Sequence, residues 1–372
     1  MKVALELQPC CGMRSGIGAY TLELIRRLTQ QPDISFQGNL FNFLSRNQGG
    51  EVTEGLSFPI RESRILPYGV YRRVWNALPF SYVRLFGPAD ITHFFNYIVP
   101  PRVGGRVVDT VYDLSYLYYP ETLEPKNLRR IQRDIGYSVE RSDRIVTISR
   151  SAKEEILGEF HLPPERVAVI PPSFDTPRPK GNFTPLREKW GIGEKYLLFL
   201  GNLEPRKNLI RLMEAFALLK REAGIPHQLV LAGGLGWRYD GILAAPGRLG
   251  LEGQVIFTGF VSAQEKAELY AHADVFVFPS LYEGFGIPIL EALSLGTPVV
   301  CSETSSMPEA GGAGALLIDP LDTGEIAQGI YTLLTDQDLR RRKVEAGLQH
   351  AAGFSWEASA AKLLALYREM TP

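Results

Sequence analysis

Short apolar runs rich in valine and isoleucine alternate with longer stretches of helical periodicity along most of this 372-residue chain. Such alternation is typical of β-α-β units, in which helices join parallel strands and cover the sheet. The chain also exceeds the length at which a single hydrophobic core usually stops growing. The pattern therefore predicts an α/β protein with two doubly wound parallel sheets.

The predicted strands form two series. The first comprises VALEL from Val3, RVVDTVYD from Arg106, RIVTIS from Arg144 and RVAVIPP from Arg166. The second comprises YLLFLGN from Tyr196, QLVLAGG from Gln228, QVIFTGF from Gln254, DVFVFPS from Asp274, PVVCSE from Pro298 and ALLIDP from Ala315. Parallel sheets bind ligands at the carboxyl ends of their strands, so functional residues are expected at the strand-to-helix turns.

The segment 173–194 separates the two series, is rich in proline and glycine, and lacks a clear periodicity. These features favour a linker. We therefore expect an N-terminal domain at 1–172 and a C-terminal domain at 195–354. A last helix, 355–372, has Ser355 as its predicted N-cap and is expected to pack back on the first domain.

The composition is that of a folded globular enzyme, with 45% hydrophobic and 22% charged residues. A formal net charge of -1 gives no reason to expect nucleic acid as a partner. Glu6 interrupts what would be the apolar region of a signal peptide, and no window approaches the ~18 apolar residues of a membrane span. Three cysteines, two of them adjacent at 10 and 11, fit a reducing cytoplasm.

Two glutamates lie eight positions apart in LYEGFGIPILEALSLGTPVV, from Leu281. Pro288 suits the first position of a helix, which is predicted to run to Leu295 and to stop at Gly296. Glu283 then lies in the preceding loop, and Glu291 lies about one turn into the helix.

The N-H groups of Phe285, Gly286 and Ile287 at this helix start are predicted to bind an anion such as phosphate. A carboxylate beside phosphate would be repelled unless it faced hydroxyl groups, so Glu291 suits a ribose diol. The alternative is structural: Glu283 caps the helix, and Glu291 is a surface residue.

The longer string PSLYEGFGIPILEALSLGTPVVCSETSSMPEAGG, from Pro279, closely resembles the retaining glycosyltransferases of family 4, in their mannosyltransferase-like branch. The resemblance implies the GT-B fold, in which two Rossmann-like domains face an interdomain cleft. It also implies that Glu291 binds the ribose of a nucleotide sugar and that Glu283 lies near the donor sugar and phosphates. Backbone groups of Phe285, Gly286 and Ile287 would contact the sugar or diphosphate.

The segment GNLEPRKNL, from Gly201, resembles the phosphate-binding segment of that family, with Arg206 and Lys207 as the cations. Such cations stabilise the charge that develops on a departing diphosphate. A solvated helix start is the structural alternative, although cations there oppose the helix dipole. Val261 matches a position whose backbone contacts the base.

In the first half, Gly16 and Gly18 match the family's glycine loop, which lies against the donor phosphates or the acceptor; a plain tight turn is the alternative. Relatives have arginine at the position of Ala19. Tyr112 stands where mannosyltransferase-like relatives have histidine, and Asp113 is retained. We expect the Tyr112 hydroxyl to bond the sugar and Asp113 to orient a hydroxyl of the donor or acceptor, with a space-filling tyrosine and a strand-end cap as the alternatives.

Two further patterns are assigned to helix starts. DQD at 336–338 matches the Asp-x-Asp metal motif of the other large glycosyltransferase fold, but its context predicts Asp336 as a helix cap. No metal or cofactor is therefore expected. SMPE from Ser306 fits a capping box closed by Glu309.

The stretch 61–106 has seven arginines against two acidic residues, a balance of +5, interleaved with aromatic residues. It could meet an anionic membrane surface or a lipid-diphosphate acceptor. Alternatively, the aromatic residues form core and the arginines are solvated. The arginines of 127–144 have the same two interpretations.

The sequence thus predicts a retaining, metal-independent hexosyltransferase of the cytoplasm, with possible peripheral membrane contact. Its expected partners are a nucleotide sugar, with GDP-mannose favoured over a UDP-sugar, and a glycan or lipid-linked acceptor. A sugar-nucleotide epimerase and a non-catalytic sugar-nucleotide-binding subunit are the alternatives. A nicotinamide dehydrogenase is disfavoured because no Gly-x-Gly-x-x-Gly follows a predicted strand.

Overall fold

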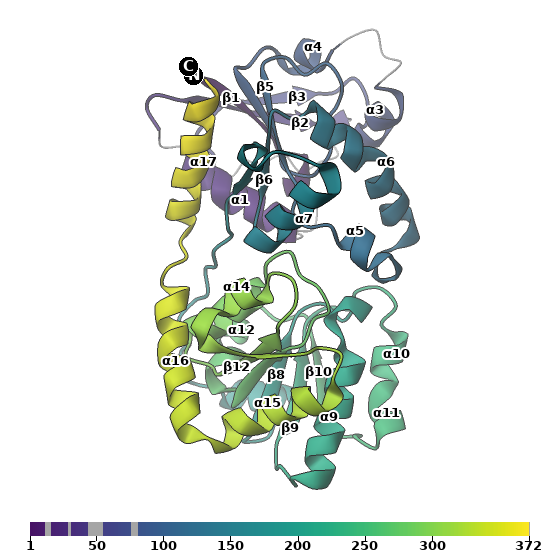
Figure 1. Ribbon diagram of the computed structural model, residues 1–372, viewed down its shortest axis with the longest axis vertical. Helices are drawn as coiled ribbons and strands as arrows, with labels where there is room; N and C mark the ends of the chain where they lie inside the picture. Colours follow the sequence, from purple (N-terminus) through teal and green to yellow (C-terminus); the bar gives the residue numbers. More distant parts are fainter. Residues whose placement is uncertain (12–15, 29–30, 44–54, 76–80, 372) are drawn as a thin grey trace. The chain divides into compact units, whose positions relative to one another are not determined.

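The computed structural model describes residues 1–11, 16–28, 31–43, 55–75 and 81–371. The chain divides into two compact units (Figure 1). Unit 1 comprises Met1–Tyr116, Pro125–Pro172 and Ser355–Pro372, and unit 2 comprises Leu117–Glu124 and Ser173–Phe354.

The sheet of unit 1 is parallel throughout. Among the described residues it has seven strands in the order β3-β2-β1-β4-β5-β6-β7. The strands are β1 (Lys2–Glu6), β2 (Ser35–Phe41), β3 (Ile60–Ser63), β4 (Ile91–Phe94), β5 (Arg106–Thr110), β6 (Arg144–Thr147) and β7 (Val167–Val169). The helices are α1 (Gly16–Leu28), α3 (Tyr68–Val74), α4 (Tyr82–Phe86), α6 (Pro125–Arg141), α7 (Arg150–Phe160) and α17 (Trp356–Met370), with α5 (Ser115–Tyr118) at the junction with unit 2.

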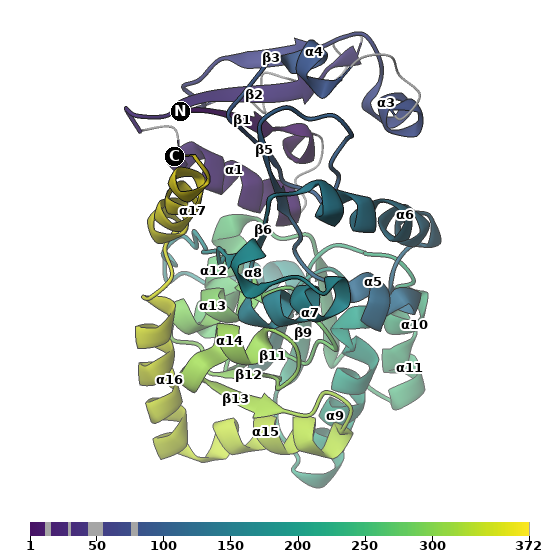
Figure 2. The same ribbon diagram turned by 45° about the horizontal axis from the view of Figure 1, so that its top comes forward.

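Three strands of unit 1, β2, β3 and β4, are absent from the sequence prediction. Figure 2 shows β3, β2 and β1 lying side by side. In β2, Gln37 and Asn39 are buried, and the Gln37 amide donates to Asn39 Oδ1 at 2.8 Å and to the Phe86 carbonyl at 2.8 Å. These polar side chains satisfy one another inside the unit, and for that reason the strand lacks an apolar run.

Helix α17 lies alongside α1 within unit 1 (Figure 1). Its predicted cap is confirmed: Ser355 Oγ accepts a hydrogen bond from the Ala358 N-H at 3.1 Å. The Tyr20 and Trp356 rings meet edge to face with centroids 5.7 Å apart. The last helix of the chain therefore completes the core of the first unit.

The sheet of unit 2 is also parallel, with six strands among the described residues in the order β10-β9-β8-β11-β12-β13. They are β8 (Tyr196–Leu200), β9 (Gln228–Ala232), β10 (Val255–Gly259), β11 (Val275–Phe278), β12 (Val299–Ser302) and β13 (Ala315–Ile318). The helices are α8 (Thr184–Trp190), α9 (Leu209–Glu222), α10 (Asp240–Leu243), α11 (Ala245–Leu249), α12 (Ala263–His272), α13 (Ile287–Ser294), α14 (Met307–Gly311), α15 (Thr323–Thr335) and α16 (Gln337–Ala351).

All six strands predicted for the second series are present, and the fully buried ones among them read as continuous apolar runs. Leu197, Leu198 and Phe199 of β8 are fully buried, as is every residue of β11. The segment 173–194 contains helix α8, which its proline and glycine content does not predict. Among the described residues, no helix is long and apolar enough to cross a membrane.

The aromatic residues of the stretch 61–106 serve the core of unit 1. Tyr71, Trp75, Tyr82 and Phe86 are buried in one hydrophobic cluster. The arginines at 61, 64, 73, 84, 102 and 106 are exposed, whereas Arg72 is buried. Residues 76–80 of this stretch lie outside the described residues. The described aromatic side chains are thus packed inside the unit.

Candidate functional site

The order of the unit 2 sheet reverses between β8 and β11. In open parallel sheets, ligands bind outside the carboxyl ends of the strands at such a reversal. Strand β8 leads into a 3-10 helix, Pro205–Lys207, and β11 leads into the loop that contains Glu283. The Leu281 N-H donates to the Arg206 carbonyl at 2.9 Å, and this bond ties the two segments together. The fold thereby brings the predicted cations next to the first predicted glutamate.

Glu283 forms ion pairs with both of those cations. Lys207 Nζ lies 2.5 Å from Glu283 Oε1, and Arg206 Nη1 lies 2.9 Å from Glu283 Oε2. Arg206 also pairs with Glu204 at 2.9 Å and donates to the Tyr282 carbonyl at 2.5 Å. The sequence predicted the cations and the glutamate, but their mutual pairing requires the folded structure.

Electrostatics keeps this cluster ionised. Burial raises the pKa of Glu283, but the charges of Arg206 and Lys207 outweigh it and hold the pKa at about 2. Burial lowers the pKa of Lys207, and the Glu283 charge opposes that shift. A buried ammonium and a buried carboxylate therefore stabilise each other's charged forms. A polyphosphate arriving here would meet cations that are already fixed in position.

Two serines hold the backbone of Glu283. The Glu283 N-H donates to Ser305 Oγ at 3.0 Å, and the buried Ser306 hydroxyl donates to the Glu283 carbonyl at 2.7 Å. The predicted capping box at Ser306 is wrong: Ser306 precedes α14, but its side chain caps no helix N-H. The hydroxyl is used in the glutamate loop instead, across more than twenty positions of sequence.

Helix α13 begins beside this loop. Its N-cap is Gly286, with φ +101° in the left-handed region that favours glycine, and Pro288 lies in the first turn. The helix ends at Ser294, close to the predicted Leu295. The first turn of a helix has N-H groups without intrahelical partners, so the segment from Phe285 to Ile287 can donate to an anion.

Glu291 lies in α13 and is buried. Its Oε1 pairs with the Lys266 ammonium, and its Oε2 accepts from the Tyr270 hydroxyl at 3.1 Å. Sequence reasoning missed both partners, although their i, i+4 spacing on α12 places them on one face. A carboxylate has about four acceptor sites, so these two bonds leave capacity for ribose hydroxyls.

Val261 lies between β10 and α12. The next residue, Ser262, caps α12 through a capping box with Glu265, in which the Ser262 N-H donates to Glu265 Oε2 at 2.8 Å. Because α12 also carries Lys266 and Tyr270, one rigid element connects the Val261 segment with Glu291. Phe260 beside it is 84% exposed.

Tyr112 and Asp113 belong to unit 1. The Tyr112 hydroxyl donates to the Phe95 carbonyl at 3.0 Å and lies 3.4 Å from Thr21 Oγ1. Burial raises the pKa of this phenol well above its usual value. Asp113 Oδ1 accepts from the Ser115 N-H at 2.9 Å, a turn that follows β5. Any contact of either side chain with a sugar stays a prediction.

The glycines of the predicted loop lie in the first turn of α1. A Cβ on Gly18 would lie 2.6 Å from the Pro9 carbonyl oxygen, so close packing of α1 against Pro9 requires glycine there. Among the described residues, no atom lies within 4 Å of such a Cβ on Gly16, so packing against them does not require glycine there. Arg14 and Ser15 of the same loop lie outside the described residues.

The DQD motif has a structural role. Asp336 Oδ1 accepts from the Leu339 N-H at 2.9 Å and caps α16, as predicted. Asp338 pairs with Arg341 at 2.7 Å on the exposed face of that helix. In the part of the chain that the structure describes, no three histidine, cysteine, aspartate or glutamate side chains are grouped to hold a metal ion.

Comparisons with known proteins agree with this architecture. The family model for glycosyl transferases group 1 matches residues 182–350, and the model for Glycosyltransferase Family 4 matches residues 14–178. The O-antigen chain mannosyltransferase B of Escherichia coli is 30% identical over 387 residues, which cover 99% of this chain and 100% of that protein. The serotype-specific mannosyltransferase WbdA of Escherichia coli is 31% identical over 70% of this chain and 33% of that protein.

Among solved structures, Anabaena Alr3699/HepE in complex with UDP and glucose has a TM-score of 0.76 at 18% identity, covering 99% of this chain and 100% of that one. This likeness shows a shared fold of two Rossmann-like units. Full-length similarity to the mannosyltransferase and a family match in each half lead to one assignment. The chain belongs to the family 4, group 1 glycosyltransferases.

Proposed function

We propose that this glycosyltransferase moves a hexose, with mannose favoured, from a nucleotide diphosphate sugar to a glycan or lipid-linked acceptor in polysaccharide synthesis. The full-length relative named O-antigen chain mannosyltransferase B supports the sugar and the pathway class. A GDP-sugar is the favoured donor because the first half of the chain resembles the mannosyltransferase-like branch of the family. A UDP-sugar is the competing donor, and the first experiment below compares the two.

One observation carries the proposal: Glu283, Arg206 and Lys207 form a fixed charge cluster where the unit 2 sheet reverses. As the glycosidic bond breaks, negative charge grows on the leaving diphosphate, and pre-positioned cations stabilise it. In this proposal Lys207 and Arg206 supply that stabilisation without a metal ion. Transfer proceeds with retention, by attack of the acceptor on the face from which the diphosphate leaves, and a diphosphate oxygen takes the acceptor proton.

The other site residues are proposed to position the donor. Glu291 accepts hydrogen bonds from the ribose, the N-H groups from Phe285 to Ile287 contact the sugar or diphosphate, and the Val261 backbone contacts the base. On the side of unit 1, Gly16 and Gly18 lie against donor phosphates or acceptor, and Tyr112 and Asp113 serve the sugar or the acceptor hydroxyl.

We place the reaction in the cytoplasm because all three cysteines are free thiols, which fits a reducing compartment. Exposed arginines of the stretch 61–106 support peripheral contact with an anionic membrane surface. Their contribution would be electrostatic, since the described aromatic residues of that stretch are buried or partly buried against the hydrophobic cluster of unit 1.

The test is a donor screen followed by a transfer assay. Thermal unfolding is measured with GDP, UDP, GDP-mannose and UDP-glucose, since a ligand at 100 times its Kd stabilises by ~2.7 kcal/mol. The proposal expects the largest shift with GDP-mannose, and acceptor-dependent release of GDP in the presence of EDTA. Loss of turnover on chelation, restored by a divalent ion, would contradict the metal-free mechanism. Inversion at the transferred carbon would contradict retention.

A further inference from the structure

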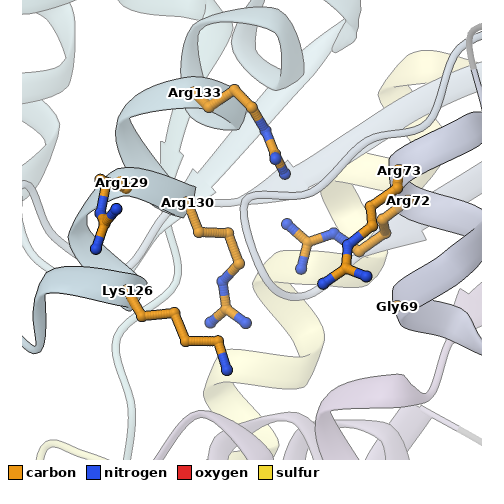
Figure 3. A pocket seen from close by; sticks show the side chains of 7 residues that line it. All are labelled: Gly69, Arg72, Arg73, Lys126, Arg129, Arg130 and Arg133. Carbon is orange, nitrogen blue, oxygen red and sulfur yellow. The ribbon is translucent and has the colours of Figure 1, made fainter.

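Unit 1 contains a pocket of about 360 Å³ between α3 and α6. Figure 3 shows basic side chains from both helices directed into the space between them. The lining residues are Gly69, Arg72, Arg73, Lys126, Arg129, Arg130 and Arg133. Apart from one glycine, every lining residue is therefore a cation.

The spacing on α6 concentrates these charges on one side of the helix. Residues 126, 129, 130 and 133 follow the i, i+3, i+4, i+7 pattern, which defines a single helical face. Like charges at i, i+3 and i, i+4 repel one another and destabilise a helix. Across the pocket, α3 contributes Arg72 and Arg73 and adds to the repulsion. An arrangement that costs stability in the free protein calls for an anion that offsets it.

Only part of this charge is neutralised by the carboxylate nearest to it. Asp134 is buried and pairs with Arg72 and with Arg133, whose Nε lies 2.6 Å from Asp134 Oδ1. Burial raises the pKa of Asp134, but hydrogen bonds from Arg133 and Arg72 outweigh it, so the group stays a carboxylate. Six lining cations against Asp134, which pairs with two of them, leave a balance of +5.

Two guanidinium groups of the pocket also have unused donors. Among the described residues, Arg72 Nε and Arg130 Nε are buried and have no hydrogen-bond partner. Buried donors are almost always paired, because an unpaired one loses its hydration without compensation. Arg72 is held in place by Asp134 and by cation-π contact with Tyr68 at 5.7 Å, so its free N-H has a fixed direction. Both unpaired donors belong to side chains that line the pocket.

We infer that the pocket between α3 and α6 is a binding site for a diphosphate group, separate from the donor site in unit 2. Guanidinium groups match phosphate oxygens in paired hydrogen bonds and are less strongly hydrated than ammonium groups. A diphosphate has enough oxygens to occupy several guanidinium groups at once. A volume of about 360 Å³ exceeds the needs of a single phosphate and falls within the range of small-molecule sites. The diphosphate is either free in solution or attached to a lipid.

The test measures thermal unfolding with sodium pyrophosphate in a Lys207→Ala background, in which the donor site lacks one of its two cations. The pocket variant is Arg73→Gln/Arg130→Gln, and the control is Arg84→Gln, an exposed arginine of α4 outside the pocket. Without ligand, the pocket variant should be at least as stable as its parent, because repulsion is removed. With pyrophosphate, the parent and the control should shift upward, and the apparent Kd of the pocket variant should rise at least tenfold.

A second arm compares phosphatidylcholine vesicles containing an isoprenyl diphosphate with vesicles containing phosphatidylglycerol. If the protein binds the diphosphate vesicles more tightly, and the pocket variant alone loses this preference, the ligand is a lipid-borne diphosphate. If the pocket binds pyrophosphate but the protein binds both vesicle types equally, the ligand is a soluble diphosphate. The proposed site is wrong if the pocket variant and Arg84→Gln bind pyrophosphate with equal affinity. It is also wrong if both variants lose binding to both vesicle types to the same extent, because that result indicates a general membrane-binding surface. If the double variant does not fold, Arg129→Gln, an exposed member of the same face, replaces it.

The proposal of a diphosphate site in the pocket and the proposed transferase reaction can be tested independently. Pyrophosphate binding that depends on the pocket while GDP-mannose fails to bind would retain the site and remove the proposed donor. The converse result is turnover of the donor together with pyrophosphate binding that is unchanged in the pocket variant. It would contradict the pocket site and leave the proposed reaction intact.

Discussion

Lys207 and Glu283 are 76 positions apart in the sequence and form a buried ion pair, with Nζ 2.5 Å from Oε1. Each residue follows one of the two strands, β8 and β11, between which the unit 2 sheet reverses. Removing one partner of a buried pair leaves an uncompensated charge, so each member holds the other in its position and charge state.

Replacing Glu283 by glutamine should destabilise the protein, because Lys207 and Arg206 then lose a buried countercharge. The expected loss in the free energy of unfolding is about 3 to 5 kcal/mol. Urea denaturation measures it, with Glu345→Gln, an exposed residue of α16, as the control that should change by less than about 0.5 kcal/mol. GDP at saturation should restore part of the loss, since a diphosphate supplies negative charge to the same cations.

The stability difference between the wild type and Glu283→Gln should also depend on pH. The pKa of Glu283 falls from its usual 4.5 to about 2 in the folded protein, so its contribution is present above pH 4.5 and disappears as the pH falls toward 2. The difference should therefore shrink as urea denaturation is repeated at successively lower pH. A difference that stays constant down to pH 2 would show that the ion pair is not its source.

Glu291→Ala should weaken nucleotide binding through the ribose. Losing a charged acceptor costs roughly 1.5 to 3 kcal/mol, which is about tenfold or more in Kd. Calorimetry with GDP and with its 2',3'-dideoxy analogue provides the comparison, and only the affinity for the full ribose should depend on Glu291. If the mutation weakens the binding of both ligands equally, Glu291 acts through the shape of α13 and not through the ribose hydroxyls.

Ser306→Ala should lower activity by more than its loss of stability alone would cause. The hydroxyl donates to the Glu283 carbonyl at 2.7 Å, and losing this bond costs about 1 kcal/mol and loosens the loop. Ser355→Ala is the matched control, because it removes the cap of α17 at a similar cost of ~1 kcal/mol. At equal loss of stability, kcat/KM should fall in Ser306→Ala alone. Equal activities would assign Ser306 a purely structural role.

Tyr112→Phe tests the residue that replaces the family histidine. A tyrosine hydroxyl near a polar site normally finds a hydrogen-bond partner, and the Phe95 carbonyl at 3.0 Å is such a partner. We now expect Phe to cost about 1 kcal/mol of stability. Measuring kcat/KM beside Asp113→Ala decides the catalytic role: a loss of tenfold or more in Tyr112→Phe after correction for stability would support contact with the sugar, and near wild-type activity would exclude it.

The sequence predicted the fold best where strands are fully buried. Strand β11 is the clearest case, because its run VFVF, from Val275, is fully buried and has no polar interruption. Strand β2 was missed because Gln37 and Asn39 are buried and donate to the Phe86 carbonyl and the Tyr82 hydroxyl, partners that only the folded unit brings close. The edge strand β3, IRES, is half-exposed and resembles a loop in composition.

For the site, residue types were predictable but partners were not. Glu283 and Glu291 were recognisable from their spacing, whereas the ion pairs with Lys207 and Lys266 cross between strand ends or helices. Ser306 fits a local capping pattern, yet its hydroxyl bonds to Glu283, because tertiary contacts override a local preference. Such pairings depend on the register of neighbouring strands, which sequence spacing alone does not give.

Lys207 is proposed to stabilise a departing diphosphate, and the variant Lys207→Ala tests this role. The measurement is acceptor-dependent release of GDP from GDP-mannose, with kcat from initial rates and donor Kd from calorimetry on the same preparations. We predict that kcat falls by about 10² to 10³, as for loss of one transition-state donor, while the Kd rises far less. A rise in Kd with unchanged kcat would contradict the account, because it would mean that Lys207 binds donor and transition state equally.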